Sequence, residues 1–101
     1  MGSRTDLHEI LCDILGSRNV YFQPPESLQM KYPAIVYSRS NIANRHADNG
    51  VYSSPKQYEV VVIDANPDSI IPDKVNLLPS ARFSRHYTAD GLNHDAFTIY
   101  Y

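Results

Sequence analysis

The sequence predicts an α+β fold: a mostly antiparallel sheet of about five strands with two helices packed on it, in the order α-β-β-β-α-β-β. Apolar residues recur at helical spacing near the start of the chain, and five later segments are rich in β-branched and aromatic residues. The chain has 101 residues, of which 43% are hydrophobic and 20% charged, values typical of one globular domain. We therefore expect residues 1–101 to form a single domain with one core.

Residues 5–15 form the clearest element, a helix with one apolar side. Ser3 or Thr5 can cap its start, and Gly16 supplies the left-handed residue that ends many helices. Cys12 flanks the apolar side, and we interpret it as a small packed residue rather than a nucleophile. The residues at helical spacing are Leu7, Ile10, Leu11, Ile14 and Leu15.

The first three strands are expected at residues 19–23, 34–39 and 57–64. Two prolines follow the first of these strands and end it, because proline cannot donate a hydrogen bond to a strand ladder. The third strand contains an unbroken apolar run from Val60 to Ile63. Such a run predicts a central strand that is buried on both faces of the sheet.

The second half of the chain adds one short helix and two strands. Residues 72–78 begin with a proline, which suits the first turn of a helix. Residues 81–88 and 93–101 flank Asp90 and Gly91, a dipeptide that strongly indicates a β-hairpin. Only one link between successive strands contains a helix, so we expect most strand pairs to be antiparallel.

Residues 41–54 differ in kind from the rest of the chain. They contain three asparagines and a glycine but few large apolar residues, which predicts a long exposed loop or a hairpin tip. This segment, together with Arg39, is our candidate for contact with a partner, and the two C-terminal tyrosines are candidate subunit contacts. The alternatives are an ordinary solvent loop for the segment and core packing for the tyrosines. The candidate contact residues are Arg39, Arg45, His46, Asp48, Tyr52, Tyr100 and Tyr101.

The sequence contains no pattern typical of a metal or cofactor site. No histidine pair has the close helical spacing of a zinc motif, and a single cysteine cannot form a thiolate cluster. Asp64, Asp68 and Asp73 lie close together in the sequence and leave a magnesium-dependent nuclease-like site as an alternative. Each of them also suits an ordinary turn or helix start. We predict a protein that is not an enzyme and has no cofactor.

Nucleic-acid binding is a second alternative, carried by the strand at residues 81–88. Its arginines alternate with aromatic residues, as in surfaces that bind single strands, although an exposed polar strand would look the same. Alternation places Arg85 and Tyr87 on one side and Ser84 and His86 on the other. The net charge of −2 lacks the basic excess that phosphate binding requires, which disfavours this function.

Two features that the sequence lacks, a long apolar run and a second cysteine, indicate where the protein is located. The longest apolar run is far too short to cross a bilayer, so we expect no membrane association. Cys12 has no cysteine with which to form an intrachain disulfide, which suits a reducing cytoplasm and disfavours a small secreted scaffold.

Taken along its whole length, the chain resembles the small tail-completion, or tail-terminator, proteins of long-tailed bacteriophages. The resemblance lies in the order of elements and in short strand phrases that follow an N-terminal helix ending in Leu-Gly. These phrases are VYFQPP at residues 20–25, YPAIVY at 32–37, YEVVVID at 58–64 and DGLNHDAFTIYY at 90–101.

This resemblance implies a virion structural protein that assembles as a ring, generally a hexamer, at the head-proximal end of the tail tube. Such proteins end tube polymerisation and join the tail to the head–tail connector, so the implied partners are copies of the chain, the tail tube protein and connector proteins. DNA would pass through the ring without specific binding, and assembly would take place in the host cytoplasm. The alternative within the same class is a head-closure or connector ring protein. No catalytic residue is implied.

Overall fold

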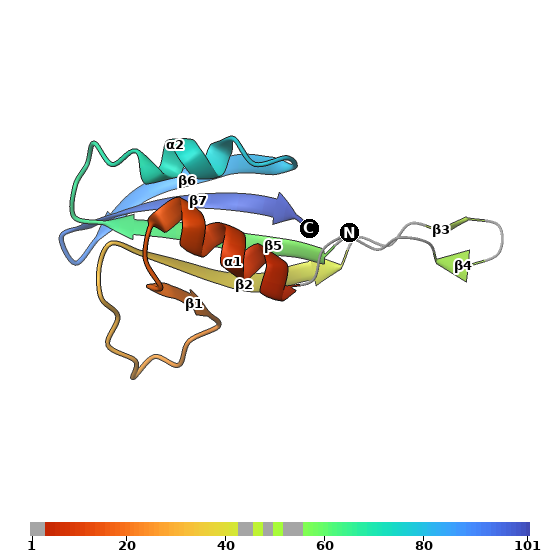
Figure 1. Ribbon diagram of the computed structural model, residues 1–101, viewed down its shortest axis with the longest axis horizontal. Coiled ribbons are helices and arrows are strands. Elements are labelled where there is room, and N and C mark those ends of the chain that lie inside the picture. The colour runs from red at the N-terminus through yellow and green to blue at the C-terminus, as the bar shows by residue number, and fades with distance from the viewer. Residues whose placement is uncertain (1–3, 43–45, 48–49, 52–55) are drawn as a thin grey trace.

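The computed structural model describes residues 4–42, 46–47, 50–51 and 56–101. Two helices and a five-stranded sheet make up the body, and two very short strands form a separate pair (Figure 1). In chain order the elements are α1 (Arg4–Leu15), β1 (Val20–Phe22), β2 (Ala34–Ile42), β3 (His46–Ala47), β4 (Gly50–Val51), β5 (Lys56–Asp64), α2 (Ile71–Asn76), β6 (Ala81–Ala89) and β7 (Leu92–Tyr100).

The five-stranded sheet has the strand order β1-β2-β5-β7-β6, and both helices lie on one of its faces (Figure 1). Three of the four strand pairings are antiparallel, and β1 pairs with β2 in parallel. The predicted α+β class and the order of its elements are confirmed, and β5 is the central strand. The parallel pair was not expected, because parallel strands are usually joined by a helix. Here a helix-free connector over residues 23–33 returns the chain so that β2 runs in the same direction as β1.

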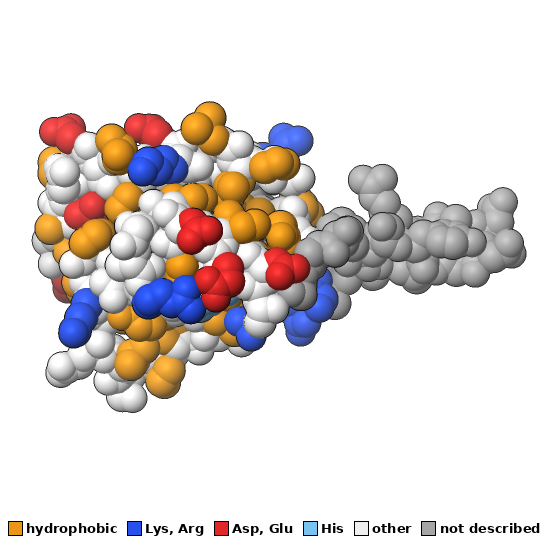
Figure 2. Space-filling view, viewed as in Figure 1, with side chains coloured by type: hydrophobic (Ala, Val, Ile, Leu, Met, Phe, Trp, Pro, Cys, Tyr) orange, Lys and Arg blue, Asp and Glu red, His pale blue; other side chains and the backbone are white. Residues whose placement is uncertain are grey.

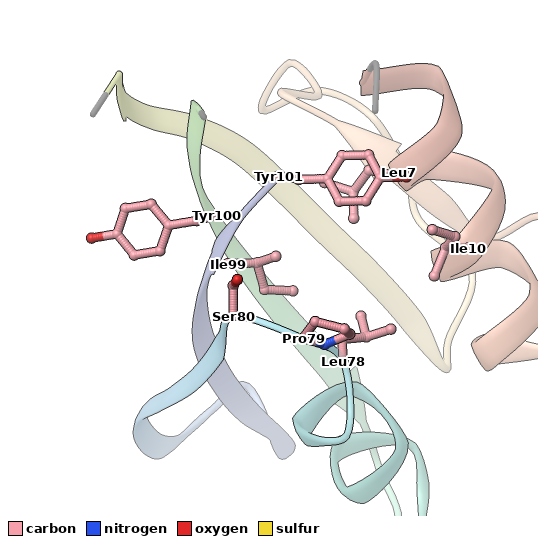
Figure 3. A pocket seen from close by; sticks show the side chains of 8 residues that line it. All are labelled: Leu7, Ile10, Leu78, Pro79, Ser80, Ile99, Tyr100 and Tyr101. Carbon is pink, nitrogen blue, oxygen red and sulfur yellow. The ribbon is translucent and has the colours of Figure 1, made fainter. Parts of the chain in front are cut away.

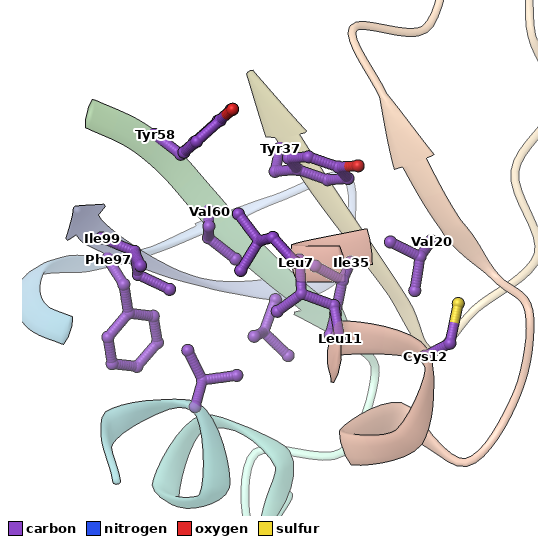
Figure 4. Packing of buried hydrophobic residues seen from close by; sticks show 12 residues of the cluster. Leu7, Leu11, Cys12, Val20, Ile35, Tyr37, Tyr58, Val60, Phe97 and Ile99 are labelled. Carbon is purple, nitrogen blue, oxygen red and sulfur yellow. The ribbon is translucent and has the colours of Figure 1, made fainter. Parts of the chain in front are cut away.

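The main core lies between the sheet and the two helices (Figure 4). From α1, Leu7 and Leu11 are buried to 1% and 0% relative exposure, as their helical spacing predicts. Alternate residues of each strand meet them, because successive strand side chains point to opposite faces. The buried members are Leu7, Leu11, Cys12, Val20, Ile35, Tyr37, Tyr58, Val60, Val62, Val75, Phe97 and Ile99.

The opposite face of the sheet, here called the open face, is covered by neither helix. It carries a smaller apolar cluster, in which Val61, Ile63 and Ala96 are buried beside Met30 of the connector, with Val36 and Leu92 completing the cluster. The apolar run of β5 therefore supplies both clusters, Val60 and Val62 on one side and Val61 and Ile63 on the other. This confirms that β5 is buried on both faces.

Residues with positive φ end the first helix and form the turn of the last hairpin. Gly16 adopts a φ of +79° and its N–H donates to the Cys12 carbonyl at 2.8 Å, so α1 ends where the sequence predicts. Asp90 and Gly91 adopt φ values of 53° and 74°, the left-handed pair that a tight hairpin between β6 and β7 requires. The second helix is shorter than predicted: it ends at Asn76, although Leu78 still packs on the main core.

A β-bulge in β6 changes which side chains share a face. The register of β6 against β7 shifts between Phe83 and Arg85, so that Phe83 lies opposite Phe97 on the helix side. Beyond the bulge, Arg85 lies opposite Ala96 on the open face. Arg85 and Tyr87 share one face and His86 occupies the other, as alternation predicts. The bulge itself carries no sequence signal that we identified.

Candidate subunit interface

The segment between β2 and β5 begins and ends at a firmly paired root. Lys56, the first residue of β5, pairs with Ile42 of β2. On its other side its N–H donates to the Tyr101 carbonyl at 3.2 Å, and the Tyr101 N–H donates to its carbonyl at 3.0 Å. Beyond this root, β3 and β4 pair with each other in a separate antiparallel sheet, His46 opposite Val51. We call residues 43–55 the arm.

The two strands of the arm are too few to be stable by themselves. An isolated two-stranded hairpin is marginally stable in water and needs packing against another element. The strand pairs described for β3 and β4 are with each other, and both strands lie beyond the ends of β2 and β5 (Figure 1). Strands of this kind are stabilised by packing against a further element.

The candidate contact residues near the arm are described only in part. Arg39 is exposed on β2, opposite Tyr58, and its backbone N–H donates to Oε1 of Gln23 at 3.3 Å. The backbone of His46 belongs to β3. The other three candidates lie outside the described residues: Arg45, Asp48 and Tyr52.

The two C-terminal tyrosines point to opposite sides of β7 (Figure 3). Tyr101 lies beside Leu7 of α1 and packs on the main core, so core packing accounts for its position. Tyr100 points away from α1 and is half-buried, which leaves part of its ring for a contact. An apolar pocket of about 250 Å³ opens next to them, lined by Leu7, Ile10, Leu78, Pro79, Ser80, Ile99, Tyr100 and Tyr101.

A polar cluster ties α1 to the buried Tyr37, and sequence reasoning missed it. The Tyr37 hydroxyl lies 2.8 Å from Nδ1 of His8 and accepts a hydrogen bond from Nη1 of Arg4 at 3.2 Å. Arg4 also lies over the ring of Phe22, 4.5 Å from its centroid. Arg4 and His8 are one helical turn apart, but the sequence does not reveal which strand residue they meet. The cluster fixes the start of α1 over β1 and β2.

Burial and charge set the protonation of this cluster. Burial, and then the nearby Arg4 guanidinium, lower the pKa of His8 below its ordinary value of 6.5; Glu9 opposes this effect and Arg18 adds to it. Burial also raises the pKa of the Tyr37 hydroxyl. The folded protein therefore favours neutral His8, whose Nδ1 can accept the hydrogen of the Tyr37 hydroxyl.

The depressed pKa of His8 predicts a loss of stability in mild acid. The unfolded state binds the His8 proton more readily than the folded state, so the free energy of unfolding falls as the pH drops below about 6.5. In His8→Asn this part of the loss should disappear. Urea unfolding of both proteins at about pH 7.5 and about pH 5.5 measures this difference. The two proteins differ only in that the wild type has a titratable histidine at position 8. An identical pH-dependent loss in the two proteins would contradict the assignment.

The open face of β6 and β7 carries a stacked group of side chains. The rings of Tyr87 and His94 stack at 4.7 Å with an interplanar angle of 14°, and the Arg85 guanidinium lies 5.0 Å from the Tyr87 centroid. His86 faces the helix side, where Nδ1 lies 2.7 Å from Oδ1 of Asp95. The two histidines of this hairpin are thus on neighbouring strands but on opposite faces, and do not form a joint site.

Of the three aspartates considered for a magnesium site, Asp64 has a structural role in the turn before α2. Oδ1 of Asp64 accepts the Asn66 N–H at 3.0 Å, and the Asp68 N–H donates to Oδ1 of Asn66 at 3.0 Å, which builds the turn before α2. Asp68 and Asp73 line an open polar hollow that Asp64 does not reach. Within the described ranges, no three His, Cys, Asp or Glu residues come together to hold a metal ion.

Cys12 is buried and unpaired in the core, and burial raises the pKa of its thiol. A thiol in that state is a poor nucleophile, in keeping with the packing role predicted for it.

No helix in the described part of the chain is long and apolar enough to span a membrane. A scan against protein-family models found no match to this chain, and a search of curated proteins found none either.

Proposed function

We propose that this chain is a virion structural protein of a long-tailed bacteriophage, a tail terminator that forms an oligomeric ring, generally a hexamer. The ring would sit at the head-proximal end of the tail tube, end tube polymerisation and join the tail to the head connector. The proposal rests on the resemblance of the strand phrases and on one structural observation: a firmly rooted arm whose two strands pair with each other beyond the ends of β2 and β5.

The arm supports this proposal because its two strands need further contacts to be stable. The root is paired on both sides, to Ile42 and to Tyr101, so the arm leaves the body at a fixed place. Its own two strands gain little stability alone, whereas pairing or packing against a neighbour would stabilise them. A subunit that presents such an arm is suited to binding copies of itself and adjacent virion parts.

The described side chains favour binding over catalysis. The Asp64 carboxylate accepts a backbone hydrogen bond in the turn before α2, and the Cys12 thiol is buried. The apolar pocket near Tyr100 has the character of a contact surface for an apolar side chain. In the proposed role DNA passes through the ring without specific recognition, and the chain works without a cofactor.

Ring formation is the test of this function. Sedimentation velocity over a wide range of protein concentration, with negative-stain images of the concentrated sample, should show a closed ring in equilibrium with smaller species. The ring should form equally with and without DNA and Mg²⁺. A chain that stays monomeric at every concentration, and cleaves DNA when Mg²⁺ is added, would replace this function with the nuclease-like alternative. Binding of the ring to the connector but not to the tube would instead indicate a head-closure protein.

A further inference from the structure

The open face presents two arginines at the β6 side of the sheet. Arg82 lies opposite Thr98, and Arg85 lies opposite Ala96; both arginines are exposed. Among the described strand residues, the one carboxylate on this face is Glu59, which lies opposite Thr98 on the far side of β7 from Arg82. The stacked ring of Tyr87 adds exposed aromatic surface at 36% exposure. This part of the face is therefore basic and aromatic.

The helix side of the same molecule presents the opposite charge. Asp6, Glu9 and Asp13 are exposed and fall on the side of α1 that points away from its buried leucines. Acidic side chains gather over α1 in the space-filling view of this side (Figure 2). Glu9 forms an ion pair with Arg18 at 2.8 Å, which neutralises part of the charge but leaves the side acidic overall.

We propose that the basic part of the open face docks against the acidic side of α1 in a second copy of this chain. Asp6 and Asp13 are about 10 Å apart along the helix axis. Arg82 and Arg85 lie opposite Thr98 and Ala96, two positions apart on β7, so the bulge brings them to about 7 Å along the sheet. The contact would cover the β6 side of a sheet face that neither helix of its own chain covers. Complementary charges would fix the register of the contact and disfavour other partners.

The positions of the two surfaces determine the kind of assembly. α1 packs over β1 and β2, whereas the arginines lie on β6, at the opposite end of the sheet and on its opposite face. One copy therefore uses different surfaces toward its two neighbours. Such a heterologous contact closes into a ring when the rotation between copies allows it. The inference rests on the proposed ring function and assigns its subunit contact.

Two charge-reversed variants test the contact. The variant Arg82→Glu/Arg85→Glu and the variant Asp6→Lys/Asp13→Lys each place like charges opposite each other, so each alone should associate roughly tenfold or more weakly than the wild type. An equimolar mixture should recover wild-type association, because copies of the two variants can alternate around a ring with every contact complementary. Sedimentation velocity measures association, and circular dichroism with thermal unfolding shows that each variant is folded.

The matched control reverses charges on α2, which belongs to neither of the two surfaces. Asp73→Lys/Lys74→Glu should assemble as the wild type does, since both residues lie in α2. If the wild type forms rings and the reversed variants associate equally well, or their mixture stays dissociated, this contact is overturned while the ring function stands. If the wild type is monomeric at every concentration, the ring function and this contact both fail.

Discussion

Phe97→Ala is expected to lower the free energy of unfolding by about 3–5 kcal/mol. Phe97 is 2% exposed on β7, next to the central strand, and belongs to the main core between the sheet and the helices. Removing its ring leaves a cavity that close-packed neighbours cannot fill. Because small domains are stable by only about 5–15 kcal/mol, the variant should unfold at a much lower urea concentration, followed by circular dichroism.

Phe83 provides a matched control for this prediction. It lies directly opposite Phe97 on β6, and the two rings meet edge to face with centroids 5.5 Å apart. Phe83 is 53% exposed, so Phe83→Ala should cost no more than about 1.5 kcal/mol, mostly from the lost ring contact. Equal costs for the two substitutions would show that Phe97 does not occupy the core position described.

Deleting residues 44–50 should abolish assembly while leaving the fold intact. The five-stranded sheet and its two helices are paired and packed without the arm, and the root is held by the pairing of Lys56 with Tyr101. Loops tolerate such changes when the elements they join stay paired. The deleted chain should keep the wild-type circular-dichroism spectrum and unfolding midpoint, whereas sedimentation velocity should show monomers at concentrations where the wild type forms rings.

A second variant separates the chemistry of the arm from its length. Replacing residues 44–50 by a Gly/Ser segment of equal length keeps the connection but removes the side chains, and should also impair assembly. Loss of the folded spectrum in the deletion variant would show that the arm belongs to the core. Normal ring formation by both variants would remove the arm from the interface.

Sequence periodicity predicted those elements whose burial follows a simple repeat. Leu7 and Leu11 lie at helical spacing, and both are buried between α1 and the sheet. The run from Val60 to Ile63 indicated a strand with two buried faces, and β5 lies at the centre of the sheet between two apolar clusters. In both cases the pattern is local, so it can be read without knowing what lies opposite.

Features that depend on distant partners could not be predicted in the same way. The bulge after Phe83 appears only when β6 is aligned with β7. The contact of His8 with Tyr37 joins residues far apart in sequence, and nothing in either neighbourhood indicates the other. The parallel pairing of β1 with β2 depends on the path of a helix-free connector. For the proposed interface, sequence composition identified the arm as distinct but not the charged surfaces on opposite faces of the sheet.

The bulge in β6 has a further consequence for the behaviour of the protein in solution. A long, flat margin on a β-sheet invites uncontrolled strand addition and fibril growth. Here that margin is interrupted near its middle and bears two cationic side chains, while the other margin is only three residues long. Both edges of the sheet are thus poor templates for amyloid-like strand addition.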